Sequence, residues 1–258
     1  MGPMPHDSTI ALVTGANKGI GQAISQRLAS MGMTVLMGSR DAGRGEQAAA
    51  ELRAAGGDVH PIVLDVTDLA SIQAAAAHIS DWPGRLDVLV NNAGISGRRP
   101  GPVPGTGGRV PGSFDLATVR AVFETNFFGV IMVTEAMLPL LRRSAAARIV
   151  NVSSGVGSLR DMTDPQHYMS TLPASGSYPT SKTALNSLTV QYAKALAADG
   201  ILVNAVAPGA CATDFTRGLP RAISRTAAQG AEIAVRMATI GSDGPTGGFF
   251  DDNGPVPW

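Results

Sequence analysis

The sequence predicts an α/β fold in which a single doubly wound parallel sheet carries helices on both faces. Six short apolar runs, rich in β-branched residues, alternate with alanine-rich segments of helical length. The runs are apolar throughout and lack a polar alternation, which is typical of strands buried on both faces. With 258 residues, of which 44% are hydrophobic, the whole chain is expected to form one domain, residues 1–258.

The predicted elements alternate along the chain, with two interruptions. Strands are expected at residues 10–13, 34–37, 59–64, 86–90, 148–152 and 201–206, and helices at 20–31, 47–55, 69–79, 116–141 and 181–198. Segment 97–112, rich in glycine and proline, and segment 159–176 are expected to be loops. Such loops beside a ligand are often lids, and the second is expected to cover the substrate side. For the first, a tolerated insertion is an equal alternative.

The first strand leads into a glycine turn and a helix start. Gly15, Gly19 and Gly21 permit positive φ and close approach of a ligand, while N–H groups at the helix start attract an anion such as a pyrophosphate. The spacing Gly-x3-Gly-x-Gly differs from the general dinucleotide fingerprint, so these residues alone also fit a turn without a ligand. The position after the first strand favours dinucleotide binding.

Each predicted strand is followed by a polar or glycine-rich cluster. Carboxyl ends of parallel strands share one edge of the sheet, and ligands bind along that edge. Any single cluster could be a simple turn, but together they predict one extended cleft. The clusters occupy residues 14–15, 39–40, 65–66, 91–94, 153–154 and 208–209.

Tyr178 and Lys182 open a predicted helix and lie four positions apart, so their side chains share one face. A neighbouring cation favours the phenolate and lowers the pKa of a phenol towards working pH, as a phenolic general acid requires. An ordinary solvated helix face is the alternative. The chain has only three lysines, which makes the position of Lys182 more informative.

Five motifs follow one another in a recognisable order: Thr14-Gly-Ala-Asn-Lys-Gly-Ile-Gly21, Asn91-Asn-Ala-Gly94, Ser154, Tyr178-x3-Lys182 and Asn204-Ala-Val-Ala-Pro-Gly209. Over essentially the whole chain this series resembles the short-chain dehydrogenases/reductases. The resemblance implies a Rossmann-like sheet and an oxidoreductase that uses a nicotinamide cofactor. No metal is expected.

The resemblance also implies individual roles. Tyr178 would donate a proton to a substrate carbonyl, and Ser154 would hydrogen-bond the same oxygen; Ser153 is the competing serine. Lys182 would hold the nicotinamide ribose and lower the pKa of Tyr178, and Asn126 would hold a water in a proton relay. Among the cofactor contacts, Asp65 would meet the adenine amino group and Thr213 the nicotinamide amide. The expected cofactor-binding residues are Gly15, Asn17, Lys18, Gly19, Ile20, Gly21, Arg40, Asp65, Val66, Asn92, Ala93, Gly94, Tyr178, Lys182, Pro208, Gly209 and Thr213.

The end of the second strand bears on the identity of the cofactor. An NAD-selective site needs a carboxylate there, which binds the ribose 2′-hydroxyl and repels a 2′-phosphate. Ser39 holds that position and Arg40, whose guanidinium suits a phosphate, follows it. Lys18 adds positive charge on the same side, whereas Asp41 lies past the discriminating position. NADPH/NADP+ is therefore expected.

Two features resemble the carbonyl-reductase branch of the family: the tail 247–258 with its aromatic ending, and the 24 positions between Ser154 and Tyr178. We therefore expect hydride transfer from NADPH to a ketone or aldehyde. An NADP-dependent alcohol or hydroxysteroid dehydrogenase working oxidatively is the alternative. A non-catalytic NADP-binding regulator is disfavoured by the intact Ser154, Tyr178 and Lys182.

Composition limits the partners that can be expected. Basic and acidic residues are equal in number, so no net charge attracts nucleic acid or an anionic membrane. No apolar run is expected to be long enough for a bilayer span, and no secretory signal is evident, so a cytoplasmic location is expected. The extra residues before Tyr178 favour a monomer or dimer over the tetramer usual in the family.

Overall fold

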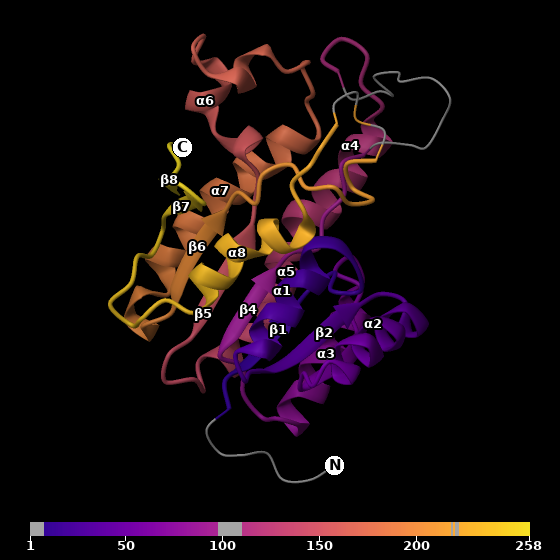
Figure 1. Ribbon diagram of the computed structural model, residues 1–258. Helices are drawn as coiled ribbons and strands as arrows, with labels where there is room; N and C mark the ends of the chain where they lie inside the picture. Colours follow the sequence, from indigo (N-terminus) through magenta and orange to yellow (C-terminus); the bar gives the residue numbers. More distant parts are fainter. Residues whose placement is uncertain (1–7, 98–109, 218, 220–221) are drawn as a thin grey trace.

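Eight strands form one sheet in the computed structural model, which describes residues 8–97, 110–217, 219 and 222–258. Their order is β3-β2-β1-β4-β5-β6-β7-β8; neighbours up to β7 are parallel, and β8 is antiparallel to β7 (Figure 1). The strands are β1 (Ile10–Val13), β2 (Thr34–Ser39), β3 (Val59–Val63), β4 (Val88–Asn91), β5 (Arg148–Val152), β6 (Leu202–Val206), β7 (Phe249–Asp251) and β8 (Gly254–Pro255). The predicted α/β fold is confirmed.

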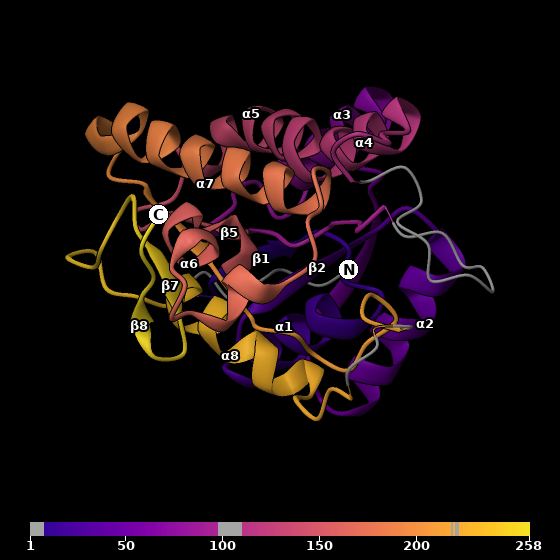
Figure 2. The same ribbon diagram turned by 90° about the horizontal axis from the view of Figure 1, so that it is seen from above.

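Helices cover both faces of the sheet (Figure 2). One layer contains α1 (Gly19–Ser30), α2 (Ala42–Ala54) and α8 (Ala227–Ala238), and the other contains α3 (Leu69–Asp81), α4 (Leu116–Phe123), α5 (Gly129–Leu141) and α7 (Tyr178–Ala195). Neighbouring strand residues enter opposite cores: Leu12 belongs to the core under α3, α5 and α7, whereas Val13 belongs to the core under α1, α2 and α8. The strands are apolar throughout because both of their faces are buried.

Several boundaries differ from the sequence prediction. Helix α2 begins at Ala42, earlier than predicted, because the Asp41 side chain caps it by accepting from Arg44 N at 2.9 Å. Helix α8 was not predicted, although Thr226 and Gln229 form a capping box at its start. Strands β7 and β8 were also missed, because two or three residues are too few for a hydrophobic period.

Residues 116–141 form one helix without a break in the chain direction. Within it, the π-helical turn η1 (Glu124–Phe128) joins α4 to α5. By length and composition this helix could cross a membrane, so the expectation that no apolar run approaches that length was wrong. Its inner residues, including Val133 and Met137, are fully buried in the core shared with α3 and the sheet. The π turn also carries Asn126, which is fully buried.

The segment 159–176, predicted as an irregular loop, instead contains a short helix, α6 (Leu159–Thr163), and a 3₁₀ turn, η3 (Tyr168–Thr171). Ser158 caps α6 by accepting from Asp161 N at 3.1 Å. We call residues 159–176 the insert. It rises above the carboxyl edge of the sheet, close to the end of the chain (Figure 1). Most of the other predicted loop, residues 98–109, lies outside the described residues.

Candidate active site

The glycine turn after β1 is packed against the end of β4. Gly15 and Gly19 have φ values of 63° and 59°, which favour glycine. A Cβ on Gly15 would lie 3.0 Å from Ala93 Cα, and one on Gly21 would lie 2.5 Å from Gly15 O and overlap Asn92 Nδ2. The turn therefore needs glycine for its conformation at the first two positions and for its packing at Gly21. Ile20, which lies between Gly19 and Gly21 in the sequence, packs against the core beneath α1 and α8.

We expect Gly21→Ala to destabilise the fold by about 1–3 kcal/mol, because the added methyl overlaps the Gly15–Asn92 contact. Gly43→Ala is the matched control: Gly43 also lies in the first turn of a helix, but its Cβ would make only an ordinary contact at 3.5 Å. That control should be stabilised by about 0.5–1 kcal/mol. Urea unfolding measures both, and equal stability of the two variants would contradict the packing argument.

Asn92 and Thr14 join the two strand ends. Asn92 Nδ2 donates to Thr14 O at 2.8 Å and to Gly15 O at 3.2 Å. Thr14 Oγ1 accepts from the backbone N–H groups of Asn92 and Ala93, each at 3.0 Å. The sequence predicted Asn92 and Ala93 but missed the part played by Thr14, although a hydroxyl residue immediately before the glycine turn was the available signal.

Ser154 and Tyr178 come together at the carboxyl edge, where β5 ends and α7 begins. Their side chains share a hydrogen bond. Ser153, the competing serine, is buried and points elsewhere, because its Oγ donates to Asn186 Oδ1 at 2.5 Å. The geometry therefore favours Ser154 for the serine role.

Lys182 lies one helical turn after Tyr178 and is 4% exposed. Its Nζ lies 5.7 Å from the centre of the Tyr178 ring and donates to Val152 O at 2.7 Å. Its other two N–H donors have no partner among the described residues, so they fit the hydroxyl groups of a ribose. This is the arrangement that the expected nicotinamide cofactor needs at this position.

Burial dominates the electrostatics of this pair. It raises the pKa of Tyr178 to about 12, and the hydrogen bond with Ser154 opposes that rise only in part. Burial also lowers the pKa of Lys182 to about 7. The expectation that Lys182 would bring the pKa of Tyr178 below its usual value is therefore wrong for this structure, because desolvation of the phenolate dominates and only the hydrogen bond with Ser154 opposes it.

The Asn126 side chain holds the backbone of the segment that follows β4. Its Oδ1 accepts from Ile95 N and its Nδ2 donates to Ile95 O, both at 2.9 Å. Nδ2 also donates to Ser181 Oγ at 3.0 Å, and that hydroxyl donates to Tyr178 O at 2.7 Å. Gly94 lies between the Asn126 and Lys182 side chains, since a Cβ on Gly94 would be 3.3 Å from Asn126 Oδ1 and 3.7 Å from Lys182 Nζ. The Asn126 side chain thus ties β4 to α7, while its role in a proton relay stays a prediction.

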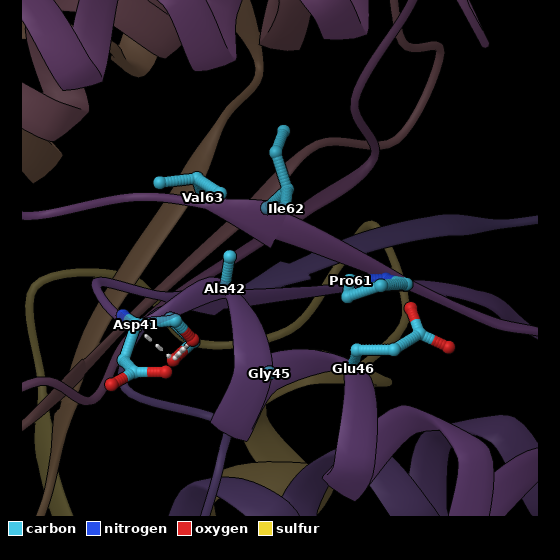
Figure 3. Close-up of a pocket in the computed structure, with 8 residues that line it drawn as sticks. Asp41, Ala42, Gly45, Glu46, Pro61, Ile62 and Val63 are labelled. Atoms are coloured by element: carbon cyan, nitrogen blue, oxygen red, sulfur yellow. Dashed lines mark hydrogen bonds between the residues drawn. The ribbon is translucent and has the colours of Figure 1, made fainter.

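The end of β2 lacks a free carboxylate at the discriminating position. Ser39 is buried and its Oγ donates to Asp41 O at 2.9 Å. Arg40 is exposed and makes no hydrogen bond or ion pair with another described residue. A cavity of about 230 Å³ opens nearby, between the start of α2 with Asp41 and Glu46 and the β3 residues Pro61, Ile62 and Val63 (Figure 3).

Lys18 faces a second hollow, of about 500 Å³, beside the glycine turn. Its Nζ donates to Asp214 Oδ2 at 3.0 Å, and Lys18, followed by Arg217, holds the pKa of Asp214 below its usual value. The charge of Lys18 is thus balanced in this structure, which the sequence did not predict. The hollow also offers the Arg44 side chain. It is lined by Asn17, Lys18, Gln22, Arg44, Gln47, Ala48, Glu51 and Asp214.

Asp65 and Val66 follow β3. One carboxylate oxygen of Asp65 accepts from Thr67 N at 2.9 Å and Thr67 Oγ1 at 2.7 Å, which fixes the side chain. Val66 is buried, and its carbonyl oxygen would lie 2.8 Å from a Cβ on Gly129. Both residues stand at the predicted edge, and the adenine contact of Asp65 stays a prediction.

The segment after β6 contacts both the glycine turn and Tyr178. Pro208 O accepts from Arg225 Nε at 2.8 Å, and Gly209 has a φ of 73°. Thr213 Cγ2 would lie 3.5 Å from a Cβ on Gly19. Phe215, which the sequence analysis missed, places its ring centre 5.3 Å from that of Tyr178. No period or motif marked this phenylalanine, because it lies in an irregular segment.

Comparison with known proteins agrees with this geometry. A family model for short chain dehydrogenases matches residues 9–224. The short-chain dehydrogenase anuI of Penicillium roqueforti is 38% identical over 238 residues, which cover 90% of this chain and 89% of that protein. Salutaridine reductase from Papaver somniferum is a solved structure with 31% identity, a TM-score of 0.77 and coverage of 95% of this chain and 99% of its own.

An NADPH-bound carbonyl reductase from chicken fatty liver is also similar in structure, with 29% identity and a TM-score of 0.82, over 97% of this chain and 99% of its own. The family match alone spans the glycine turn and the Ser154–Tyr178 pair. With this fold, these motifs and these relatives, the chain belongs to the short-chain dehydrogenase/reductase family of oxidoreductases, which bind nicotinamide cofactors.

Proposed function

We propose that the protein is an NADPH-dependent carbonyl reductase, which transfers a hydride from NADPH to the carbonyl carbon of a ketone or aldehyde. The observation that carries this proposal is the hydrogen bond between Ser154 and Tyr178, with the buried amine of Lys182 beside it. These two neighbouring hydroxyls could both donate to a bound carbonyl oxygen, which becomes more negative during the reaction.

The side chains divide the chemistry between them. Ser154 and Tyr178 hold and polarise the carbonyl oxygen, and Tyr178 remains protonated at neutral pH because its pKa is about 12. When bound, NADPH supplies the hydride that is added to the carbonyl carbon. Tyr178 Oη donates its proton to the oxygen, which completes the alcohol. Lys182, with a pKa of about 7, can carry a positive charge near the resulting phenolate.

Supplying the protein with a panel of ketones, aldehydes and alcohols tests the function. The loss of NADPH absorbance should be fast with one class of carbonyl compound at neutral pH, and slow with NADH. Formation of NADPH from NADP+ with an alcohol, and no reduction of any carbonyl compound, would favour the oxidative alternative. Binding of NADPH without turnover of any compound would favour a regulator.

The preference for NADPH rests on the end of β2. Ser39 provides no carboxylate against a 2′-phosphate, and beside it Arg40 is exposed, with a guanidinium that has no partner among the described residues. The carboxylate of Asp41 is directed to Arg44, as the cap of α2. The NADPH complex of the chicken carbonyl reductase supports the same assignment.

Arg40→Ala should weaken NADPH binding by roughly 1.5–3 kcal/mol, about ten- to a hundredfold, because it removes a charged hydrogen bond to the phosphate. NADH binding should be almost unchanged, since NADH lacks that phosphate. Titration of the protein with each cofactor measures both dissociation constants. Arg53→Ala is the control, because Arg53 is an exposed arginine of α2 that pairs with Glu46. Equal losses for NADPH and NADH would mean that Arg40 does not bind the phosphate.

A further inference from the structure

Three large apolar side chains from separate parts of the chain pack on Tyr178 or on glycines within two residues of Ser154 and Tyr178. Phe215, 39% exposed, packs beside the Tyr178 ring. Phe114 packs on Gly176, at the end of the insert that leads to Tyr178, because a Cβ on Gly176 would overlap its ring. Met169 packs on Gly155, at the Ser154 end. These contacts place aromatic rings next to Tyr178 and the residues before it, and a methionine next to the residue that follows Ser154.

Met169 packs on Gly155, the residue that follows Ser154. A Cβ on Gly155 would overlap the Met169 methyl group and lie 3.2 Å from its sulfur, so the end of the methionine rests directly on the glycine. The turn η3 presents this side chain: Met169 N donates to His167 Nδ1 at 3.3 Å, and Leu172 N donates to Met169 O at 3.1 Å. One flexible apolar side chain therefore fills the space beside Gly155, directly after Ser154.

The insert that carries Met169 is connected to the end of the chain. Arg160 N, in α6, donates to Trp258 O at 3.1 Å. The Trp258 ring stacks on Phe249 with ring centres 5.6 Å apart and an angle of 17° between the planes. Phe249 is buried in β7, and β7 pairs with β6. Contacts thus run from the sheet through Trp258 to α6, and α6 contacts the turn that holds Met169.

We propose that Met169 is a specificity-determining residue that limits the width of the carbonyl site beside Ser154, and that Trp258 is a positioning residue that holds Met169 there. The inference rests on the proposed reductase function and deepens it. The preferred substrate class is a carbonyl compound with an aromatic group, which packs against Phe215, and a second group that is no wider than a methyl.

Acetophenone and isobutyrophenone test the width directly, because they share the phenyl group and differ only in methyl against isopropyl. Met169→Ala should raise kcat/KM for isobutyrophenone relative to acetophenone by about tenfold or more. Met169→Leu, which conserves the volume, should keep the wild-type ratio. Tyr168→Ala, on the same turn but 55% exposed, should also keep it. The dissociation constant of NADPH should be unchanged in all three variants.

The positioning role of Trp258 makes a separate prediction. Trp258→Ala removes the stack on Phe249. It should therefore raise kcat/KM for isobutyrophenone relative to acetophenone, by a smaller factor than Met169→Ala does. Trp258→Phe should keep the wild-type ratio. If Trp258 acts through Met169, then Trp258→Ala should add no further shift in the Met169→Ala background. Equal shifts in both backgrounds would refute the positioning role.

Failure of the inference can be distinguished from failure of the proposed function. If the wild-type protein reduces acetophenone with NADPH but Met169→Ala leaves the ratio unchanged, the width proposal is overturned and the function stands. If the wild-type protein reduces neither ketone, the proposed function fails for this class of ketone. Equilibrium binding of the two ketones then tests the width proposal. Tighter binding of isobutyrophenone by Met169→Ala than by the wild type would support that proposal. Unchanged binding, or no binding of either ketone, would overturn it.

Discussion

Replacing Tyr178 by Phe should lower the turnover of carbonyl reduction by about 10² to 10⁴ or more, the range for a lost general acid. The change removes only the phenolic oxygen, which is the proposed proton donor and the partner of Ser154. Ser154 would still donate to the carbonyl oxygen, so binding of the ketone should weaken less than turnover. NADPH affinity and stability should remain nearly intact, because the ring and its contact with Phe215 are kept.

Tyr192→Phe is the matched control for this prediction. Tyr192 lies on the same helix and its hydroxyl donates to Glu135 Oε1 at 2.8 Å, away from the catalytic pair. This control should lose about 1 kcal/mol of stability from one hydrogen bond and keep its turnover. Single-turnover rates with NADPH in excess measure the chemical step in both variants. A Tyr178→Phe protein with near-normal rate would refute the assignment of the proton donor.

The alternation of strands and helices could be predicted from sequence because each central strand is buried on both faces. That burial requires residues such as Leu12 and Val13 to be apolar in succession, whichever core they enter. The clusters at the carboxyl edge were predictable for a related reason, since parallel strands end at one edge. Strands β7 and β8 lacked such a signal, because their positions depend on pairing with β6 and on the stack between Phe249 and Trp258.

The site itself was predictable where a motif constrains the backbone, and less so where side chains meet across the fold. Gly21 and Asn92 meet as their motifs require. The ion pair between Lys18 and Asp214 joins residues nearly 200 positions apart, and nothing local to either residue indicates it. The rise in the pKa of Tyr178 also comes from burial, which spacing along a helix does not report. Spacing along the chain predicts which side chains are neighbours on a helix, whereas the desolvation of the Tyr178 phenol depends on every element that packs around it.

Lys182→Met should impair two steps at once. The substitution removes two free N–H donors that fit the nicotinamide ribose, so the dissociation constant of NADPH should rise. It also removes the cation beside the Tyr178 phenolate, so turnover with saturating NADPH should fall. Lys194→Met, in the last turn of the same helix, is the control and should change neither value. A change in only one of the two would mean that Lys182 has a single role.

The same variant should also change how stability depends on pH. Burial lowers the pKa of Lys182 from 10.5 to about 7, so between these values the unfolded chain binds more protons than the folded chain. The contribution of Lys182 to the free energy of unfolding therefore rises with pH across that window, by at most about 1.4 kcal/mol per pH unit. This contribution is lost as the pH falls towards 7. Lys182→Met has no charge to bury, so its advantage over the wild type in urea unfolding should be largest at or below pH 7 and shrink towards pH 10. A stability difference that stays constant over this range would show that the Lys182 amine titrates normally in the folded protein, and its proposed charge change near neutral pH would then be wrong.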